Sequence, residues 1–211
     1  MKNVPLLIGT LLGTVLLVVG LAFVFSRPEP VKIVDTALVI GSDRAFRGPE
    51  NAKVTVVEFS DFQCPACRAA QPLVEKIIAE HPNDVRFVFR HYPLTTIHKN
   101  AQYSAQVGEA SRSFNKFWEM HDLMFLNQDE WVELEGKELT AKFDEYATKL
   151  GIDKTALTAK MNSKEIKDVV ASDIADGNKA GVTGTPTFFV NGQLTSAPQL
   201  QTTVESALSA K

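Results

Sequence analysis

The stretch FQCPAC, from Phe62 to Cys67, decides the fold, and it contains the only two cysteines of the chain. It follows an apolar, β-like run at residues 54–59 and precedes a segment with helical periodicity. One apolar face of that predicted helix consists of Leu73, Val74, Ile77 and Ile78. A C-x-x-C pair between a strand and a helix is typical of a redox pair that cycles between dithiol and disulfide.

The two cysteines have different places in the predicted helix. Cys64 lies at its N-terminus, where the helix dipole and the unpaired N–H groups favour a thiolate. We therefore expect Cys64 to be the nucleophile that forms a mixed disulfide with a substrate. Cys67 lies one turn further in, where it should be shielded, and we expect it to resolve that intermediate. Pro65 occupies the first helical position, where its missing N–H costs nothing.

Other uses of the cysteine pair are weaker. A structural zinc site needs four ligands, and the histidines do not form the H-x₃₋₅-H pair that such sites usually show. These histidines are His81, His91, His98 and His121. We therefore predict no metal. A purely structural disulfide would add only about 2 kcal/mol, because the loop that it closes is small. The sequence also contains no phosphate loop and no Ser-His-Asp arrangement.

Composition places the chain among ordinary globular proteins. Its 211 residues allow one domain of comfortable size, with 45% hydrophobic and 22% charged residues. The net charge is −3 and no basic block stands out, so nucleic-acid binding has no support. The sequence contains no separate dimerisation domain, and we expect a monomer.

An uncharged run of 22 residues, Val4–Phe25, lies near the N-terminus. As a helix it would span about 33 Å, enough for a bilayer core. A cleavable signal peptide is the alternative, with Gly20 and Ala22 before the cut, but its apolar region is normally shorter. We therefore predict an uncleaved anchor and tether at residues 1–30. Lys2 favours a cytoplasmic N-terminus, which makes a single-pass cell-membrane protein with its body on the extracytoplasmic, oxidising side.

The remaining pattern predicts a βαβ unit, a set of helices and a ββα unit. A strand at 85–89 follows the first helix and should pair in parallel with the strand at 54–59. Strands at 187–190 and 193–194 form a hairpin with a type I′ turn at Asn191-Gly192, and a helix covers 198–208. The apolar residues 37–40 predict an edge strand. The helices predicted between the two units cover residues 102–114, 116–126, 139–150, 154–161 and 166–180.

This layout resembles the thioredoxin fold, and more closely the DsbA-like thiol–disulfide oxidoreductases that carry a helical insertion. The resemblance covers about residues 45–208. Its motifs are VEFSDFQCPAC at 57–67, FRHYPL at 89–94, IHKNA at 97–101 and VTGTPTF at 182–188. The resemblance implies an α/β, thioredoxin-like fold, and the run Val4–Phe25 predicts one transmembrane helix before it. Its parts would be residues 31–97 with the C-x-x-C, an inserted all-helical subdomain at 98–181, and residues 182–211 with a cis-proline loop.

In this family the last motif holds a cis-proline beside the cysteine pair, and Pro186 occupies that place. The resemblance implies that Thr185 offers backbone hydrogen bonds to a bound substrate strand, next to Pro65 and Ala66. Strong oxidants of the family carry a histidine between the cysteines. Because the alanine side chain cannot donate a hydrogen bond or carry charge, the resemblance does not imply extreme acidity of the Cys64 thiol or extreme oxidising power.

Glu58 lies six residues before Cys64, where related proteins hold a buried acid beneath the redox pair. If it is buried, its pKa would be raised and it could move protons to or from Cys67. The alternative is an exposed strand carboxylate, because alternation alone does not decide which face the residue occupies. Of the histidines, we expect His121 to be a hydrogen-bonded core residue and His98 to cap or pack at the start of the insertion.

Together these features predict an enzyme, a membrane-anchored thiol–disulfide oxidoreductase that introduces disulfides into exported proteins with free thiols. The cysteine pair carries the electrons itself, so we expect no cofactor. By resemblance, an integral membrane, quinone-linked partner would reoxidise it. Two alternatives stay open: a disulfide reductase or isomerase of the same fold, and a tethered binding or chaperone module with an incidental C-x-x-C. If the chain is such a binding or chaperone module, Cys64→Ala should be harmless to its function.

Overall fold

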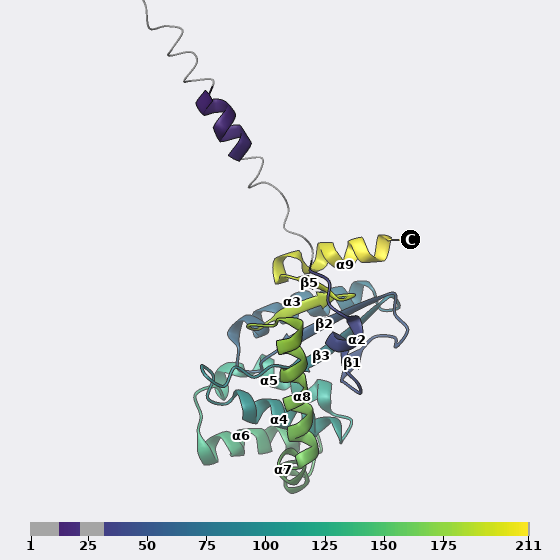
Figure 1. Ribbon diagram of the computed structural model, residues 1–211. Coiled ribbons are helices and arrows are strands. Elements are labelled where there is room, and N and C mark those ends of the chain that lie inside the picture. The colour runs from purple at the N-terminus through teal and green to yellow at the C-terminus, as the bar shows by residue number, and fades with distance from the viewer. Residues whose placement is uncertain (1–12, 22–31, 211) are drawn as a thin grey trace, which may run out of the picture. The chain divides into compact units, whose positions relative to one another are not determined.

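The computed structural model describes residues 13–21 and 32–210 (Figure 1). The chain divides into two units, Met1–Lys32 and Ile33–Lys211. Residues 13–21 of the first unit are helical, and the predicted membrane helix Val4–Phe25 lies for the most part outside the described residues. Across the two described stretches, none of the helices has both the length and the apolar character needed to span a bilayer.

The second unit is built on a mixed sheet with the strand order β1-β3-β2-β4-β5. The strands are β1 (Phe46–Arg47), β2 (Val54–Ser60), β3 (Val85–His91), β4 (Thr187–Val190) and β5 (Gln193–Thr195). β2 and β3 are parallel neighbours, as the βαβ pattern predicts, and β4 is antiparallel to β2. The predicted type I′ turn is confirmed, because Asn191 and Gly192 have φ values of 48° and 82°.

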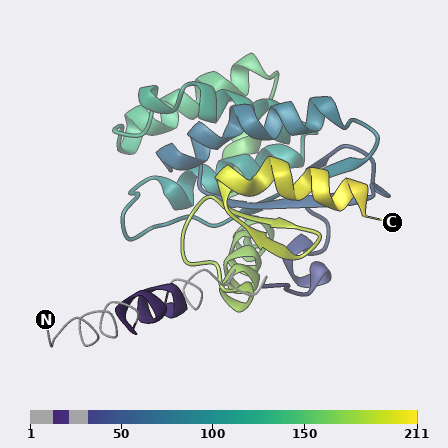
Figure 2. The same ribbon diagram turned by 90° about the horizontal axis from the view of Figure 1, so that it is seen from above.

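Helices follow the predicted order, and all five helices predicted between the two units are present. The helical segments are α2 (Thr36–Ile40), α3 (Pro65–Glu80), α4 (Ala101–Arg112), α5 (Phe117–Leu126), η1 (Gln128–Glu130), α6 (Gly136–Lys149), α7 (Lys154–Met161), α8 (Lys164–Ala180), η2 (Ala197–Gln199) and α9 (Leu200–Ser209). Figure 2 shows α3 and α9 on one side of the sheet and α8 on the other.

The predicted edge strand at residues 37–40 is wrong. These residues belong to the short helix α2, and β1 forms the sheet edge beside β3 instead. Asp35 caps α2, since its carboxylate accepts a hydrogen bond from the Ala37 N–H at 2.9 Å. Gly41 ends the helix with a φ of 69°, a conformation that favours glycine. Local capping therefore outweighs the β-like composition of the apolar run.

Alternation along β2 divides its side chains between two cores. Val54 and Val56 pack with α3, α9 and much of the helical region in one continuous cluster. Val57 and Phe59 belong to a second cluster with residues of α2 and α8. Glu58 is separated from Val56 by two positions, so it points toward the α3 side of the sheet. This places its carboxyl group beneath the N-terminal turn of α3, which carries the cysteines.

Candidate active site

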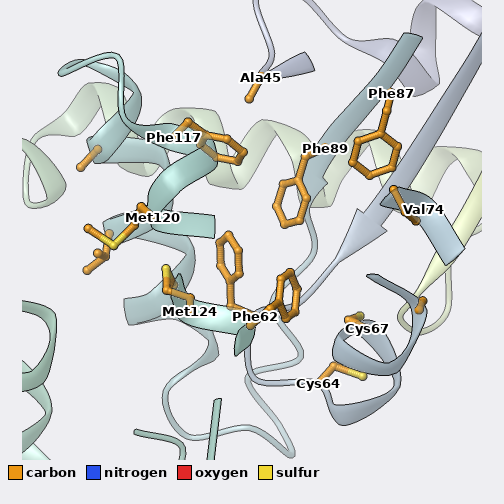
Figure 3. Close-up of a cluster of buried hydrophobic side chains, with 14 of the residues drawn as sticks. Ala45, Phe62, Cys64, Cys67, Val74, Phe87, Phe89, Phe117, Met120 and Met124 are labelled. Carbon is orange, nitrogen blue, oxygen red and sulfur yellow. The ribbon is translucent and has the colours of Figure 1, made fainter. Parts of the chain in front are cut away.

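The cysteine pair lies at the start of α3, next to the buried ring of Phe62 (Figure 3). Cys64 is the N-cap residue, with extended backbone angles, and Pro65 begins the helix as predicted. Both cysteines are free thiols. Cys64 is 5% exposed and Cys67 is fully buried, so Cys64 is the sulfur that a second molecule can reach, although it is more covered than an exposed helix end would suggest.

The surroundings push the pKa values of the two thiols apart. The Cys67 thiol donates a hydrogen bond to Cys64, and this bond is the largest cause that lowers the pKa of Cys64, to about 5. The backbone N–H groups of Cys67 and Ala66 act in the same direction, whereas burial opposes them. Burial is the largest cause that raises the pKa of Cys67 far above its ordinary range. The pair therefore holds one thiolate and one thiol.

The loop before β4 closes over Cys64. The Thr185–Pro186 peptide bond is cis, as the resemblance implies for this position. The Cys64 Sγ lies 3.4 Å from the Thr185 carbonyl oxygen, and the Thr187 hydroxyl donates to the Gly184 carbonyl at 2.7 Å. These contacts bring the backbone before Pro186 against the Cys64 sulfur, although the two segments are far apart in the sequence.

Pro65 and Ala66 are exposed on the first turn of α3. They flank Cys64, the sulfur that faces the cis-proline loop. Their role in binding a substrate stays a prediction, together with that of Thr185.

Glu58 is fully buried in the middle of the sheet, which excludes the exposed carboxylate that alternation left open. The Ser60 hydroxyl donates to its Oε1 at 2.7 Å, and the Gln71 amide donates to its Oε2 at 3.4 Å. Burial raises the pKa of Glu58 from 4.5 to about 7, and the hydrogen bonds only partly oppose this effect. Its charge in turn contributes to the raised pKa of Cys67. A carboxyl group of this kind can accept or release a proton near neutral pH.

Asp61 is not among the predicted site residues, yet it holds the backbone before the cysteines. Its carboxylate accepts hydrogen bonds from the Gln63 N–H at 2.8 Å and the Leu94 N–H at 2.9 Å. His98 Nδ1 lies 2.7 Å from the same carboxylate. His98 therefore packs near the start of the helical region, but Asn100, not His98, is the N-cap of α4. An Asp two residues before an N–H is an Asx-turn signal that the sequence does contain.

Two buried glutamines link the helical region to the same loop. Gln128 belongs to the helical region, and Gln63 belongs to the loop. The Gln128 amide donates to the carbonyl oxygens of Phe62 at 2.7 Å and of Cys64 at 3.0 Å. The Gln63 amide donates to the Val132 carbonyl at 3.0 Å and accepts from the Asn100 N–H at 2.6 Å. These bonds fix the backbone that carries Cys64. No local sequence signal predicts Gln128, because its partners lie more than sixty residues away.

His91 and His121 lie in the core, whereas His81 is half-buried at the C-terminal end of α3. His121 is buried, its Nδ1 lies 2.8 Å from Asp122, and burial lowers its pKa, which agrees with the expected core role. His91 Nε2 lies 3.2 Å from Glu109, and both residues are buried. Among the described residues, no three His, Cys, Asp or Glu side chains gather to hold a metal ion.

Comparison with known proteins agrees with this geometry. A family model described as thioredoxin matches residues 42–210. A thioredoxin-like oxidoreductase from Silicibacter pomeroyi is 27% identical, with a TM-score of 0.70 over 84% of this chain and 100% of that one. BdbD from Bacillus subtilis is 23% identical, with a TM-score of 0.69 over 79% of this chain and 94% of BdbD. The thiol–disulfide exchange protein α-DsbA2 from Wolbachia pipientis is 18% identical, with a TM-score of 0.67 over 81% of this chain and 90% of α-DsbA2. The latter two likenesses concern the fold.

Curated relatives add a different context. Na⁺/H⁺ antiporter NhaA 3 from Salinispora tropica is 38% identical over 162 residues, which are 76% of this chain and 24% of the antiporter. NhaA 1 from Salinispora arenicola matches at the same identity and over the same shares. The chain therefore spans about a quarter of the length of these relatives.

Proposed function

The chain belongs to the thioredoxin family and is a thiol–disulfide oxidoreductase, and we propose that it introduces disulfide bonds into exported proteins that carry free thiols. The observation that carries this proposal is the asymmetry of the cysteine pair. Cys64 is the accessible sulfur with a lowered pKa, whereas Cys67 is buried and has a raised pKa. Because the Cys64 thiolate is stabilised, the reduced pair is favoured and the disulfide is readily passed on.

The reaction begins with the oxidised pair. A substrate thiolate attacks Cys64 Sγ, the Cys64–Cys67 bond breaks, and Cys67 leaves as a thiolate that takes a proton from Glu58. A second substrate thiolate then attacks the substrate sulfur of the mixed disulfide, and Cys64 leaves as a stabilised thiolate. The substrate loses two electrons and gains one disulfide, while the pair becomes the dithiol. Thr185 and Pro186 border the space where the substrate strand would lie.

The cellular setting belongs to the same proposal. The uncharged run Val4–Phe25 supports a single-pass anchor, with the catalytic unit on the extracytoplasmic side of the cell membrane, where thiol substrates meet an oxidising environment. An integral membrane, quinone-linked partner would return the pair to the disulfide, and the enzyme would act as a monomer. Sodium–proton exchange is not part of the proposal, since the match covers about a quarter of the antiporter relatives.

A disulfide reductase or isomerase of the same fold is the second candidate. It is favoured by Ala66, which offers no side-chain donor to the Cys64 thiolate. The lowered pKa of Cys64 argues against it, because a stabilised thiolate makes the pair more oxidising.

Trapping of substrates tests the proposed function. Cys67→Ala leaves the Cys64 thiolate able to attack disulfides of exported proteins, but it removes the thiol that would then attack Cys64 Sγ and release the partner, so mixed disulfides through Cys64 should accumulate on non-reducing gels. Cys64→Ala is the matched control and should trap few, because Cys67 is fully buried. Equal trapping by both variants, or trapping by neither, would contradict the division of roles. It would favour a binding module with an incidental cysteine pair.

A further inference from the structure

A cavity of about 490 Å³ lies between α3 and α5, beyond the first turn of α3. Its α3 wall consists of Arg68, Gln71, Pro72 and Glu75, which share one helical face. Gln71 therefore has one side toward open space. Its other side lies over the buried part of the site, one helical turn after Cys67.

Gln71 connects Glu58 with the backbone of the resolving cysteine. Its Nε2 lies 3.4 Å from Glu58 Oε2 and 3.2 Å from the Cys67 carbonyl oxygen. Its Oε1 is buried and has no hydrogen-bond partner among the described residues. The Gln71 amide nitrogen therefore donates to groups of the site, whereas its amide oxygen accepts no hydrogen bond from the described residues. The adjacent cavity leaves room for the amide to turn.

Glu58 has few other partners that could respond to its charge. The residues opposite it on β3 and β4 are Phe89 and Phe188, and neither titrates. From α3, the titratable groups that act on it are Cys64 and Cys67. The Ser60 hydroxyl donates to the other carboxyl oxygen. Gln71 is therefore the group through which the helix can adapt to the protonation state of this carboxyl group.

We propose that Gln71 is a positioning residue that keeps Glu58 aligned with Cys67 in both halves of the redox cycle. Its amide donates to the ionised carboxylate and turns to accept from the protonated carboxyl group, which a glutamine can do because it carries both a donor and an acceptor. This inference rests on the proposed function, since it concerns the proton that Glu58 and Cys67 exchange when the Cys64–Cys67 disulfide opens or forms.

A single-turnover reaction isolates that step. When the reduced protein reacts with dithiobis(nitrobenzoate), the Cys64 thiolate displaces one thionitrobenzoate and forms a mixed disulfide. Cys67 then attacks Cys64 Sγ, its proton passes to Glu58, and a second thionitrobenzoate leaves as the Cys64–Cys67 disulfide forms. Two electrons pass from the pair to the reagent. The pH dependence of the second release reports the ionisation of Glu58, because Cys64 carries no charge in the mixed disulfide.

Gln71→Met removes the donor and the acceptor with little change of volume. A charge-assisted hydrogen bond is stronger than a neutral one, so the loss acts mainly on the ionised form. In the pH profile of the rate of the second release, the midpoint should move upward by roughly half to one pH unit. Below that midpoint the second release should slow roughly three- to tenfold. The first release should be unchanged. Gln71→Glu should move the midpoint upward as well, through like-charge repulsion.

Gln201→Met is the matched control. It makes the same chemical change on α9, where the amide contacts Lys76 and Glu205, and it should leave the midpoint in place. If the unaltered protein gives the first release but not the second, the proposed function fails and the inference fails with it. If both releases occur and Gln71→Met leaves the midpoint unchanged, the proposed function stands and the role of Gln71 is refuted.

Discussion

Glu58→Gln should change how the stability of the protein depends on pH. In the folded chain burial raises the pKa of Glu58 from 4.5 to about 7. Between these two values the folded state keeps the proton that the unfolded state releases, so stability falls as pH rises through this window and is level above it. The shift corresponds to about 3 kcal/mol. The glutamine has no charge to bury and can keep its contacts with Ser60 and Gln71, so it should escape this loss.

Urea unfolding of the oxidised protein measures this effect without interference from the thiols, because neither cysteine titrates in the disulfide. At about pH 4 the unaltered protein and Glu58→Gln should have similar free energies of unfolding. At about pH 8 the variant should be more stable by about 3 kcal/mol. Parallel pH profiles for the two proteins would refute the claim that a buried carboxyl group with a raised pKa lies beneath the cysteine pair.

Three other changes test the surroundings of the pair. In the reduced Cys67→Ala variant, the ultraviolet absorbance of the Cys64 thiolate should still titrate below the free-thiol value of about 8.5, owing to the helix N-terminus; a midpoint at or above that value would contradict the nucleophile assignment. Gly108→Ala would place a Cβ 2.6 Å from the Phe62 ring. Because this overpacking outweighs the gain in helix propensity, urea unfolding should show that the free energy of unfolding falls by about 1 kcal/mol. Unchanged stability would disprove this contact. Gln128→Leu leaves two buried carbonyl groups without their donor and should cost about 1–3 kcal/mol in the same assay, whereas a neutral effect would show that the loop does not depend on it.

Local pattern predicts most of the elements of this fold. The periodicity before and after Cys64 predicts β2 and α3, and the Asn191-Gly192 pair predicts the hairpin of β4 and β5. Prediction fails at α2, where five apolar or β-branched residues resemble a strand. There, a capping Asp35 and a terminating Gly41 select a short helix. The error shows that caps can decide a segment that is too short for its periodicity to be informative.

The site is less accessible to sequence reasoning than the fold. Cys64 and Cys67 can be assigned from spacing, but the approach of Thr185 to Cys64 follows from strand order, and here only a family resemblance anticipates it. Alternation alone does not tell which face Glu58 occupies, since that depends on where α3 packs. Gln128 lies outside any local motif, because side-chain bonds to a distant backbone have no sequence period.

The reduction potential of the Cys64–Cys67 pair tests the central claim most directly. It can be measured by equilibrating the protein with glutathione buffers of known composition and counting free thiols. Because the Cys64 thiolate is stabilised but the Ala66 side chain adds no donor, we expect a value less negative than the about −270 mV of thioredoxin and more negative than the about −120 mV of DsbA. A value at or below about −270 mV would contradict disulfide introduction, since such a pair would favour the reduction of its substrates.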